Sequence, residues 1–493
     1  MNKILLVCLT IALVLLETLA LSAQKKLNSN DTFIKIDNYL NEGTKNGFSG
    51  VIAVTIKGKT IINKGYGLAN KKTQTANGPN TIFDIGSNTK QFTSTAILKL
   101  AEQAKVNLND SLSKFFKNLP LDKQSITIHQ LLTHTAGLEE SIGNDYSSFG
   151  KLSEISEKDF FENLFESKLL SKPGEEYSYS NVGYSILGRI IELASEQPYE
   201  AFINEYLFKP AGMKQTGYLL PKWNIKQLSR GYNRNIIETE PTVTLYQEAN
   251  GVNWHLKGNG GINSTQNDMI LWHKALKSNK ILSKESRNKF SIPFIPINPE
   301  KTHSYSYGWI VNNSISNALR LSHSGSNGTF WHTIIWYPKK DIYIVYATNA
   351  NSSKVESIAY AVAKIVLDQN YIPEPIENNV YSFIMDYMKE YPTNKSNELI
   401  VLLKENHADD FTNSRTLNTV GNLLLRSNEN LNWAVELFEM NVLLYPRDGN
   451  LWDSLGDGYK AIDSKEDAIN SYKKAIELGY EESQEKLTEL SKN

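Results

Sequence analysis

The stretch TIFDIGSNTK, residues Thr81–Lys90, places a serine three residues before a lysine, at Ser87 and Lys90. Residues i and i+3 share one face of a helix, so a helix that begins here sets the lysine amine beside the serine hydroxyl. Backbone N–H groups and the positive end of the helix dipole also gather at a helix start. An amine shielded from water has a lowered pKa and can take a proton from a hydroxyl. The spacing therefore favours a nucleophilic serine, and the alternative is that Ser87 only caps the helix.

Strand patterns lie on both sides of a long helical region. A hairpin is predicted over Ser49–Gly67, and three later strands are predicted at Leu319–Ser322, Phe330–Trp336 and Ile342–Ala347. Between them, apolar residues recur with helical spacing, as in Ser87–Ala104. We therefore predict an α+β fold in which the first hairpin joins the late strands in one antiparallel sheet flanked by helices, beside an all-α helical cluster.

The C-terminal part of the chain has a different character, with helical patterns and no strand pattern. We expect a linker over residues 369–394 and an all-α domain over residues 395–493. One set of residues stands at the spacing of a tetratricopeptide repeat: Trp452, Leu455, Gly456, Tyr459, Ala468, Tyr472 and Ala475. The alternative is a pair of amphipathic helical hairpins of no special kind. A tetratricopeptide-like domain would offer a surface for a protein partner, or it would serve only as a stabilising cap.

The N-terminal residues 1–23 have the pattern of a secretory signal peptide. Lys3 is followed by the apolar stretch Ile4–Leu16 and by the small residues Ser22 and Ala23. The apolar stretch is shorter than the ~20 residues of a membrane-spanning helix. We expect cleavage and a secreted or periplasmic protein, with an uncleaved membrane tether as the alternative.

Composition excludes several classes of function. Lys and Arg number 52 against 53 Asp and Glu, so no basic excess indicates a nucleic-acid partner. Cys8 is the one cysteine, which leaves no thiolate ligands for zinc or an iron–sulfur cluster. The sequence has no H-E-x-x-H motif and no nucleotide-binding glycine motif after a strand. We therefore expect no metal and no organic cofactor.

Further motifs follow the serine and lysine in a fixed order. They are ITIHQLLTHTAGL at Ile126–Leu138, KPGEEYSYSNVGYSILG at Lys172–Gly188, GNGGINSTQNDMILW at Gly258–Trp272 and LSHSG at Leu321–Gly325. The series resembles the penicillin-recognising serine hydrolases, specifically the class C β-lactamase and serine D-Ala-D-Ala carboxypeptidase type. The resemblance covers residues 30–368 and implies the same fold for them. His134, in the motif Ile126–Leu138, is interpreted as a structural residue.

The resemblance implies roles for particular residues. Ser87 matches the acylated nucleophile and Lys90 the lysine that balances protons in the site. Tyr179 and Asn181 match the Y-x-N element, in which the tyrosine acts as general base and the asparagine binds the substrate carbonyl or amide. The alternatives are that Tyr179 is only a core tyrosine and that Asn181 only caps a helix.

A second element of the site comes from a predicted strand. The triplet from His323 to Gly325 stands where the family has K-T-G, and Ser326 would donate a backbone N–H to an oxyanion hole beside that of Ser87. The alternative is an edge strand with a bend. His323 departs from the family's lysine, and a histidine is mostly neutral near pH 7, so attraction of a substrate carboxylate should be weaker. An H-x-G triplet resembles the esterase-like and aminopeptidase-like branches.

Two hypotheses about function follow. The first is a secreted serine hydrolase that cleaves an amide, peptide or ester bond in a small-molecule or peptide substrate through an acyl-enzyme on Ser87. The second is a catalytically weak or inactive penicillin-binding-like protein that acts as a peptide-binding or regulatory module through residues 395–493. The presence of Ser87, Lys90 and Tyr179 together favours the first.

Overall fold

The computed structural model describes residues 29–142, 154–249, 251–312, 318–350, 354–409 and 411–492. The predicted signal peptide, residues 1–23, lies outside the described residues. Within those residues, none of the helices is both long enough and apolar enough to cross a membrane.

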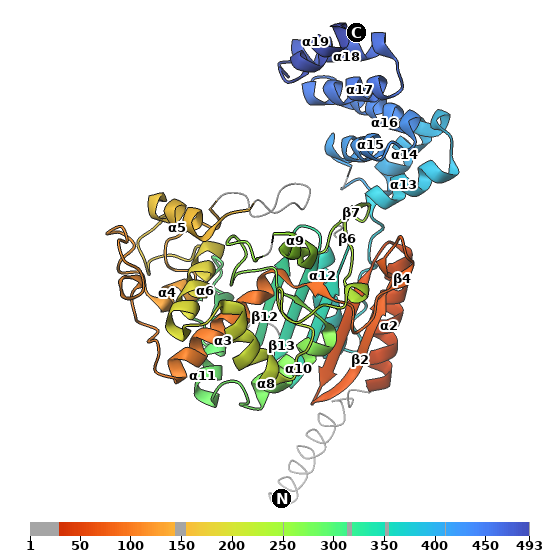
Figure 1. Cartoon of the computed structure of the whole chain (residues 1–493). Coiled ribbons are helices and arrows are strands. Elements are labelled where there is room, and N and C mark those ends of the chain that lie inside the picture. The colour runs from red at the N-terminus through yellow and green to blue at the C-terminus, as the bar shows by residue number, and fades with distance from the viewer. Residues whose placement is uncertain are drawn as a thin grey trace, which may run out of the picture.

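One eight-stranded antiparallel sheet forms the centre of the larger, α+β domain (Figure 1). Its spatial order is β2-β1-β14-β13-β12-β11-β10-β9. The strands are β1 (Gly50–Ile56), β2 (Lys59–Tyr66), β9 (Ile295–Pro296), β10 (His303–Tyr305), β11 (Ile310–Asn312), β12 (Arg320–Ser326), β13 (Trp331–Tyr337) and β14 (Ile342–Thr348). The first hairpin joins the late strands through β1 and β14, with Ala53 opposite Val345. The predicted α+β fold with one antiparallel sheet is confirmed.

Both faces of the sheet are covered, which explains why the central strands are apolar on both sides. Ile52 and Ile344 point to one face, where they pack with α2 (Ser29–Lys45) and α12 (Val355–Leu367). Val345 points to the other face and joins the larger core. That core includes α3 (Thr89–Glu102), α4 (Ile128–Leu132), α5 (Glu157–Glu166), α6 (Asn181–Ser195) and α10 (Gln266–Lys277). These helices form the predicted helical cluster.

Shorter elements connect the sheet to the helical cluster. The helical turns are α7 (Tyr199–Ile203), α8 (Lys209–Ala211), α9 (Thr242–Glu248) and α11 (Lys284–Asn288). The short strands form three pairs: β3 (Leu68–Asn70) with β4 (Thr75–Ala76), β5 (Phe83–Asp84) with β8 (Asn263–Ser264), and β6 (Gly231–Asn233) with β7 (Ile237–Thr239). The β5–β8 pair leads directly into the turn that carries Ser87.

The C-terminal part of the chain is all-helical, and we call it the helical unit. It contains α13 (Val380–Glu390), α14 (Ser396–Asn406), α15 (Arg415–Ser427), α16 (Leu431–Leu444), α17 (Gly449–Ala461), α18 (Lys465–Glu477) and α19 (Ser483–Lys492). The linker predicted over residues 369–394 was too long, because α13 lies inside it and packs into the core of the helical unit through Val380 and Ile384. The all-α character is confirmed, and the tetratricopeptide class stays a prediction.

In the helical unit, a glycine on one helix packs against an aromatic ring on the next helix, and this contact sets the distance between the two helices. A Cβ on Gly421 of α15 would lie 2.5 Å from a ring carbon of Phe438 on α16. A Cβ on Gly456 of α17 would lie 2.5 Å from a ring carbon of Tyr472 on α18. Glycine therefore lets the helices approach closely in two successive pairs.

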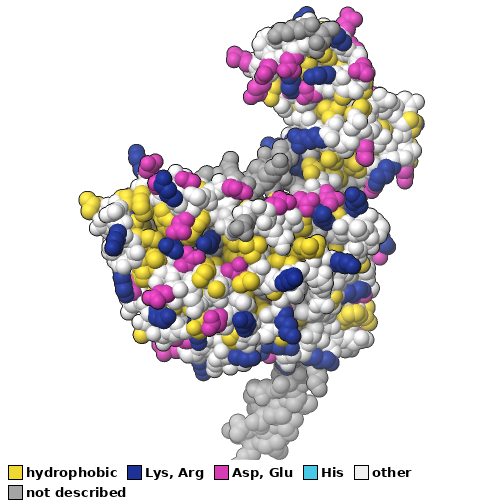
Figure 2. Space-filling view, in the orientation of Figure 1, with side chains coloured by type: hydrophobic (Ala, Val, Ile, Leu, Met, Phe, Trp, Pro, Cys, Tyr) yellow, Lys and Arg dark blue, Asp and Glu magenta, His cyan; other side chains and the backbone are white. Residues whose placement is uncertain are grey.

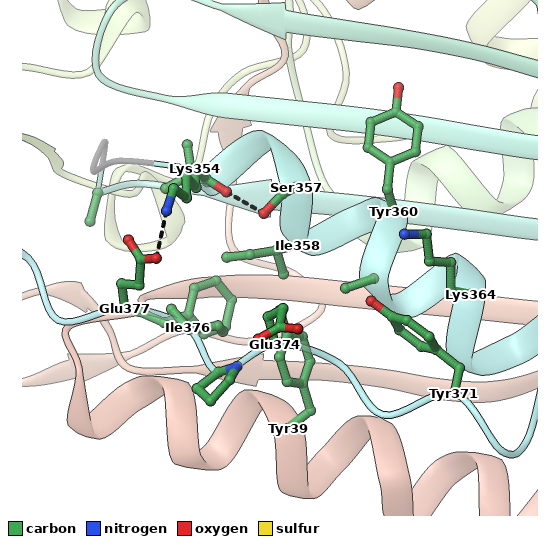
Figure 3. Close-up of a pocket in the computed structure, with 15 residues that line it drawn as sticks. Tyr39, Lys354, Ser357, Ile358, Tyr360, Lys364, Tyr371, Glu374, Ile376 and Glu377 are labelled. Carbon is green, nitrogen blue, oxygen red and sulfur yellow. Dashed lines mark hydrogen bonds and ion pairs between the residues drawn. The ribbon is translucent and has the colours of Figure 1, made fainter. Parts of the chain in front are cut away.

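A narrow neck joins the helical unit to the α+β domain (Figure 2). Ile376 in the connecting segment packs on α2, and the Asn46 amide donates to its carbonyl oxygen at 2.6 Å. The segment borders a cavity of about 490 Å³ between α2 and α12, where Lys354 pairs with Glu377 (Figure 3). On the other side of the neck, the Asn235 amide between β6 and β7 donates to Ser382 of α13 at 2.8 Å.

Replacing Gly456 by Val should destabilise the helical unit by about 1–3 kcal/mol, because the new side chain would overlap the Tyr472 ring. Guanidinium unfolding followed by circular dichroism and tryptophan fluorescence measures the change. Gly78→Val is the control, since a Cβ there meets no atom within 4 Å, and it should unfold like the wild type. Equal stability of Gly456→Val and the control would contradict the close helix packing.

Candidate active site

Ser87 lies in a single 3-10 turn, Gly86–Asn88, between β5 and α3. Its hydroxyl does not cap the helix that follows: the residue in the cap position of α3 is Asn88, which makes no side-chain capping bond. The Ser87 Oγ instead lies 3.0 Å from Nζ of Lys90, one helical turn on. The predicted i, i+3 contact between hydroxyl and amine is therefore formed.

Lys90 is fully buried, with no exposed side-chain surface. Besides Ser87, its Nζ donates to Oδ1 of Asn181 at 2.7 Å and to the carbonyl oxygen of Asn259 at 2.9 Å. A carbonyl and an amide oxygen only accept hydrogen bonds, so these two contacts fix two of the amine protons. The contact with the Ser87 hydroxyl is the one that can reverse direction, because a hydroxyl both donates and accepts.

Tyr179 lies over the same amine, with Nζ of Lys90 4.8 Å from its ring centre. A hydrogen bond with Ser87 lowers the pKa of Tyr179, but burial raises it much more, so the phenol is protonated near neutral pH. Glu140 and the neighbouring tyrosines raise the pKa further. Tyr179 therefore rests as a neutral hydroxyl beside the nucleophile.

Asn181 is the first residue of α6, and its amide oxygen holds Lys90. The helix cap is Ser180, whose hydroxyl accepts from the Gly183 N–H at 3.0 Å. The Asn181 side chain is therefore directed at the lysine and not used as a cap. The structure brings together Ser87, Lys90, Tyr179 and Asn181, which come from two segments more than eighty residues apart.

The end of β12 passes very close to the turn before Ser87. A Cβ on Gly86 would lie 2.5 Å from the Ser326 backbone nitrogen, and Gly86 has φ +50°. A Cβ on Gly325 would lie 2.1 Å from the Ile85 carbonyl oxygen and 2.5 Å from the Ser87 nitrogen. Glycine at both positions therefore lets the backbone nitrogens of Ser87 and Ser326 lie near each other, as an oxyanion hole requires.

His323 carries no charge at neutral pH. Burial lowers its pKa to about 3, and the nearby Lys90 lowers it as well. Its Nδ1 lies 2.7 Å from the Ser324 carbonyl oxygen, which can only accept, so this nitrogen carries the proton. Nε2 then accepts from the Tyr305 hydroxyl at 3.1 Å. The imidazole is a neutral, fully hydrogen-bonded replacement for the family's lysine.

One residue of the site, Asn259, was not assigned a role from the sequence, and His134 was assigned only a structural one. The Asn259 carbonyl holds Lys90, and the Asn259 side chain is fixed by donating to Ser185 at 2.9 Å and to His255. The GNGG motif was visible, but its asparagine acts through the backbone. His134 accepts from the Ser180 N–H at 3.0 Å and packs on the Tyr179 ring, with 4.3 Å between ring centres. His134 therefore supports Tyr179, in agreement with a structural role.

The described residues contain no group of three or more His, Cys, Asp or Glu placed to hold a metal ion.

A protein-family model described as Beta-lactamase matches residues 36–367 of the chain. The chain belongs to the beta-lactamase family. Protein flp of Staphylococcus aureus (strain MW2) is 30% identical over 341 residues, which cover 67% of this chain and 66% of flp. The match thus spans about two thirds of that relative's length. The resemblance inferred from the ordered motifs is confirmed.

Solved structures of beta-lactamase-family type share the fold. The octameric penicillin-binding protein homologue from Pyrococcus abyssi has a TM-score of 0.59 at 24% identity, covering 72% of this chain and 81% of that one. The D-amino acid amidase from Ochrobactrum anthropi SV3 has a TM-score of 0.57 at 21% identity, covering 68% and 97%. These two likenesses concern the fold.

Buried neutral histidines predict acid sensitivity of this beta-lactamase-family domain. Burial lowers the pKa of His273, His323 and His332 to about 3, below the 6.5 of an exposed histidine. The unfolded chain therefore binds more protons, so the stability these groups contribute is present above pH 6.5 and is lost as pH falls toward 3. We expect the free energy of unfolding to decrease over this window.

His273→Phe tests this expectation, because the ring stack on Tyr343 is kept and one titrating group is removed. The slope of unfolding free energy against pH should fall by up to about 1.4 kcal/mol per pH unit. Tyr343→Phe is the control, since it keeps the histidine and should shift the curve without changing its slope. An unchanged slope in His273→Phe would show that this histidine is not neutral in the folded state.

Proposed function

We propose that the protein is a serine hydrolase that cleaves an ester, amide or peptide bond through an acyl-enzyme on Ser87. The observation that carries the proposal is the 3.0 Å contact between the Ser87 hydroxyl and the buried Lys90 amine, whose other protons are held by two obligate acceptors. A serine hydroxyl is a weak nucleophile until a neighbouring base takes its proton, and this arrangement supplies that base.

In the acylation step, Ser87 Oγ forms a bond to the substrate carbonyl carbon, and its proton moves to the neutral amine of Lys90. The backbone N–H groups of Ser87 and Ser326 stabilise the negative oxygen of the tetrahedral intermediate. As the intermediate collapses, the Tyr179 hydroxyl gives its proton to the leaving alcohol or amine, and Lys90 returns a proton to Tyr179. The family resemblance assigns the general base to Tyr179, but burial favours its protonated form, so we assign the first proton transfer to Lys90.

Deacylation follows the same path with water as the nucleophile. The water attacks the acyl carbonyl, the Lys90–Tyr179 pair takes its proton, and the proton returns to Ser87 Oγ as the acid leaves. Asn181 keeps the Lys90 amine in place through both steps and supplies amide hydrogens for the substrate.

Electrostatics around the site favour donors that carry no carboxylate. The neutral His323 replaces a cation, and Glu140 is near enough to raise the pKa of both Tyr177 and Tyr179. The negative charge of Glu140, without a cation at position 323, disfavours binding of a substrate carboxylate and tolerates a substrate amine. We therefore propose neutral or amine-bearing esters and amides as preferred substrates over β-lactams.

We further propose that residues 1–23 are a cleaved signal peptide and that the enzyme acts in a secreted or periplasmic setting, because this segment has the charged start and apolar stretch of such signals.

A second function, compatible with the first, is proposed for the cleft between the helical unit and the β6–β7 hairpin. The cleft has a volume of about 750 Å³ and is lined by Arg234, Arg415 and Arg426, together with Asp453 and Asp457, whose carboxylates pair with Lys486. Amides of Asn418, Asn422 and Asn450 line it as well, and Oδ1 of Asn418 is buried with no hydrogen-bond partner among the described residues. Guanidinium groups bind carboxylates and amides bind an extended backbone, so the fitting partner is an acidic peptide segment.

Acyl-enzyme formation tests the hydrolase proposal. Incubating the mature protein with a p-nitrophenyl ester, a D-amino acid amide and a penicillin should give a mass gain of one acyl group with the ester or the amide, or rapid turnover of them. Intact-mass spectrometry and product release measure both. Ser87→Ala should lose the adduct and lower turnover at least about 1,000-fold.

Ser113→Ala serves as the matched control, because the Ser113 hydroxyl is exposed and hydrogen-bonds to Ser111, which is not part of the candidate site. Faster acylation by penicillin than by the ester would contradict the proposed substrate class. If no donor gave either an adduct or turnover, the hydrolase proposal would be wrong and the binding-module hypothesis would take its place.

The partner proposal is tested with a fluorescein-labelled decapeptide of alternating Asp and Gly, and a Lys and Gly peptide for comparison. Fluorescence anisotropy should show binding of the acidic peptide alone, weakened at least tenfold by Arg415→Glu. Arg447→Glu, outside the cleft, is the charge-matched control and should bind like the wild type. Equal binding of both peptides, or no binding of either, would overturn the assignment of the cleft.

A further inference from the structure

Asp84 is a buried carboxylate that the catalytic steps above do not use. It is the last residue of β5, three positions before Ser87, and its side chain is 2% exposed. A carboxylate removed from water in this way is costly unless several donors hydrogen-bond to it. The groups that hydrogen-bond to Asp84 therefore indicate its role.

The two oxygens of Asp84 hold three separate segments. Oδ1 accepts from the Gly86 backbone N–H at 2.7 Å, in the turn that presents Ser87. Oδ2 accepts from the Asn327 side-chain amide at 2.9 Å and from the Thr242 hydroxyl at 3.0 Å. Asn327 directly follows Ser326, so one carboxylate ties together the two backbone segments that carry the oxyanion donors.

Asn327 extends this connection into the turn between β12 and β13. Its Oδ1 accepts from the backbone N–H groups of Thr329 at 3.1 Å and Phe330 at 2.8 Å. The amide nitrogen is thereby left to Asp84, and the orientation of the Asn327 side chain is fixed by the hydrogen bonds at both ends. Although burial raises the pKa of Asp84, both of its oxygens and both ends of the Asn327 amide are hydrogen-bonded, so the link has little freedom to move.

We propose that Asp84 is the positioning residue of the oxyanion hole: it sets the separation of the Ser87 and Ser326 N–H groups by bridging Gly86 and Asn327. The proposal rests on the acyl-transfer function proposed above. Asp84 touches no reacting atom and acts through the backbone segments that it holds. Misplacement of catalytic groups by about 1 Å can lower a rate by about 100-fold, so the effect of losing this bridge should be kinetic as well as structural.

Asp84→Asn tests the proposal, because the amide keeps the size of the side chain and replaces one acceptor with a donor. With the ester substrate, kcat should fall about 10- to 100-fold while KM stays within about twofold, since the oxyanion donors act mainly in the transition state. The infrared carbonyl stretch of the acyl-enzyme should move to higher frequency, because the hydrogen bonds that polarise the carbonyl are weakened.

Asp268→Asn is the matched control. Asp268 is also a buried aspartate with three donors, the N–H groups of Lys214 and Gln215 and the Thr216 hydroxyl, but these do not belong to the oxyanion segments. It should lower the melting temperature without changing kcat or the carbonyl frequency. The exchange variant Asp84→Asn/Asn327→Asp should recover most of the lost kcat, because the amide introduced at position 84 then donates to the new carboxylate and still accepts from Gly86.

Two outcomes would overturn the proposal and are distinguishable. If the wild type forms an acyl-enzyme and Asp84→Asn has the wild-type kcat and carbonyl frequency, the positioning role is wrong while the hydrolase function stands. If the wild type forms no acyl-enzyme and turns over no donor, the hydrolase function and the role of Asp84 fail together. A kcat lowered equally in Asp84→Asn and Asp268→Asn would show a purely structural effect and would also overturn the proposal.

Discussion

The close approach of β12 to the turn before Ser87 is the constraint on which the site depends. Gly325 and Gly86 face each other at a distance that leaves no room for a Cβ on either residue. The sheet thereby brings Ser326, the 3-10 turn brings Ser87, and the first turn of α3 brings Lys90 to one place. The position of β12 is fixed by its pairing with β13 in the sheet. The sheet continues from β13 through β14 to β1. The sheet therefore sets the spacing of the site as well as supporting it.

A single buried amine surrounded by neutral groups explains the electrostatics of the site. Burial lowers the pKa of His134 and His323 and raises that of Tyr179, so all three side chains rest uncharged around Lys90. Each neutral group costs less to bury than a charged one, and each avoids a competing charge next to the amine. A lysine at position 323 would place a second titratable amine in the same buried site as Lys90. The exchange of lysine for histidine thus makes the burial of Lys90 easier and removes the anchor for a substrate carboxylate.

Much of the fold could be predicted from the sequence because its signals are local. The apolar strands β1 and β14 and the helical spacing of α3 are properties of short segments. The ordered motifs also located Ser87, Lys90, Tyr179 and Asn181, although their roles stay proposals. The contributions of Asn259 and Asp84 could not be read in this way, since one acts through a backbone carbonyl and the other through hydrogen bonds to segments more than 150 residues away. The linker was predicted to extend over α13, because the proline-containing segment before the Asn379 cap resembles a longer linker.

The β6–β7 hairpin contacts both the helical unit and the α+β domain. At one end, Arg234 donates to Thr419 of α15 and its guanidinium lies 5.0 Å from the Tyr381 ring centre. At the other end, the hairpin packs so tightly on the β12–β13 turn that a Cβ on Gly231 would lie 2.5 Å from a Thr329 methyl carbon. That turn is the one organised by Asn327, next to Ser326. The β6–β7 hairpin therefore lines the cleft at the helical unit and also packs against the turn that follows Ser326. The hairpin is thus held at one end by α13 and α15 and at the other end by the turn that Asn327 organises.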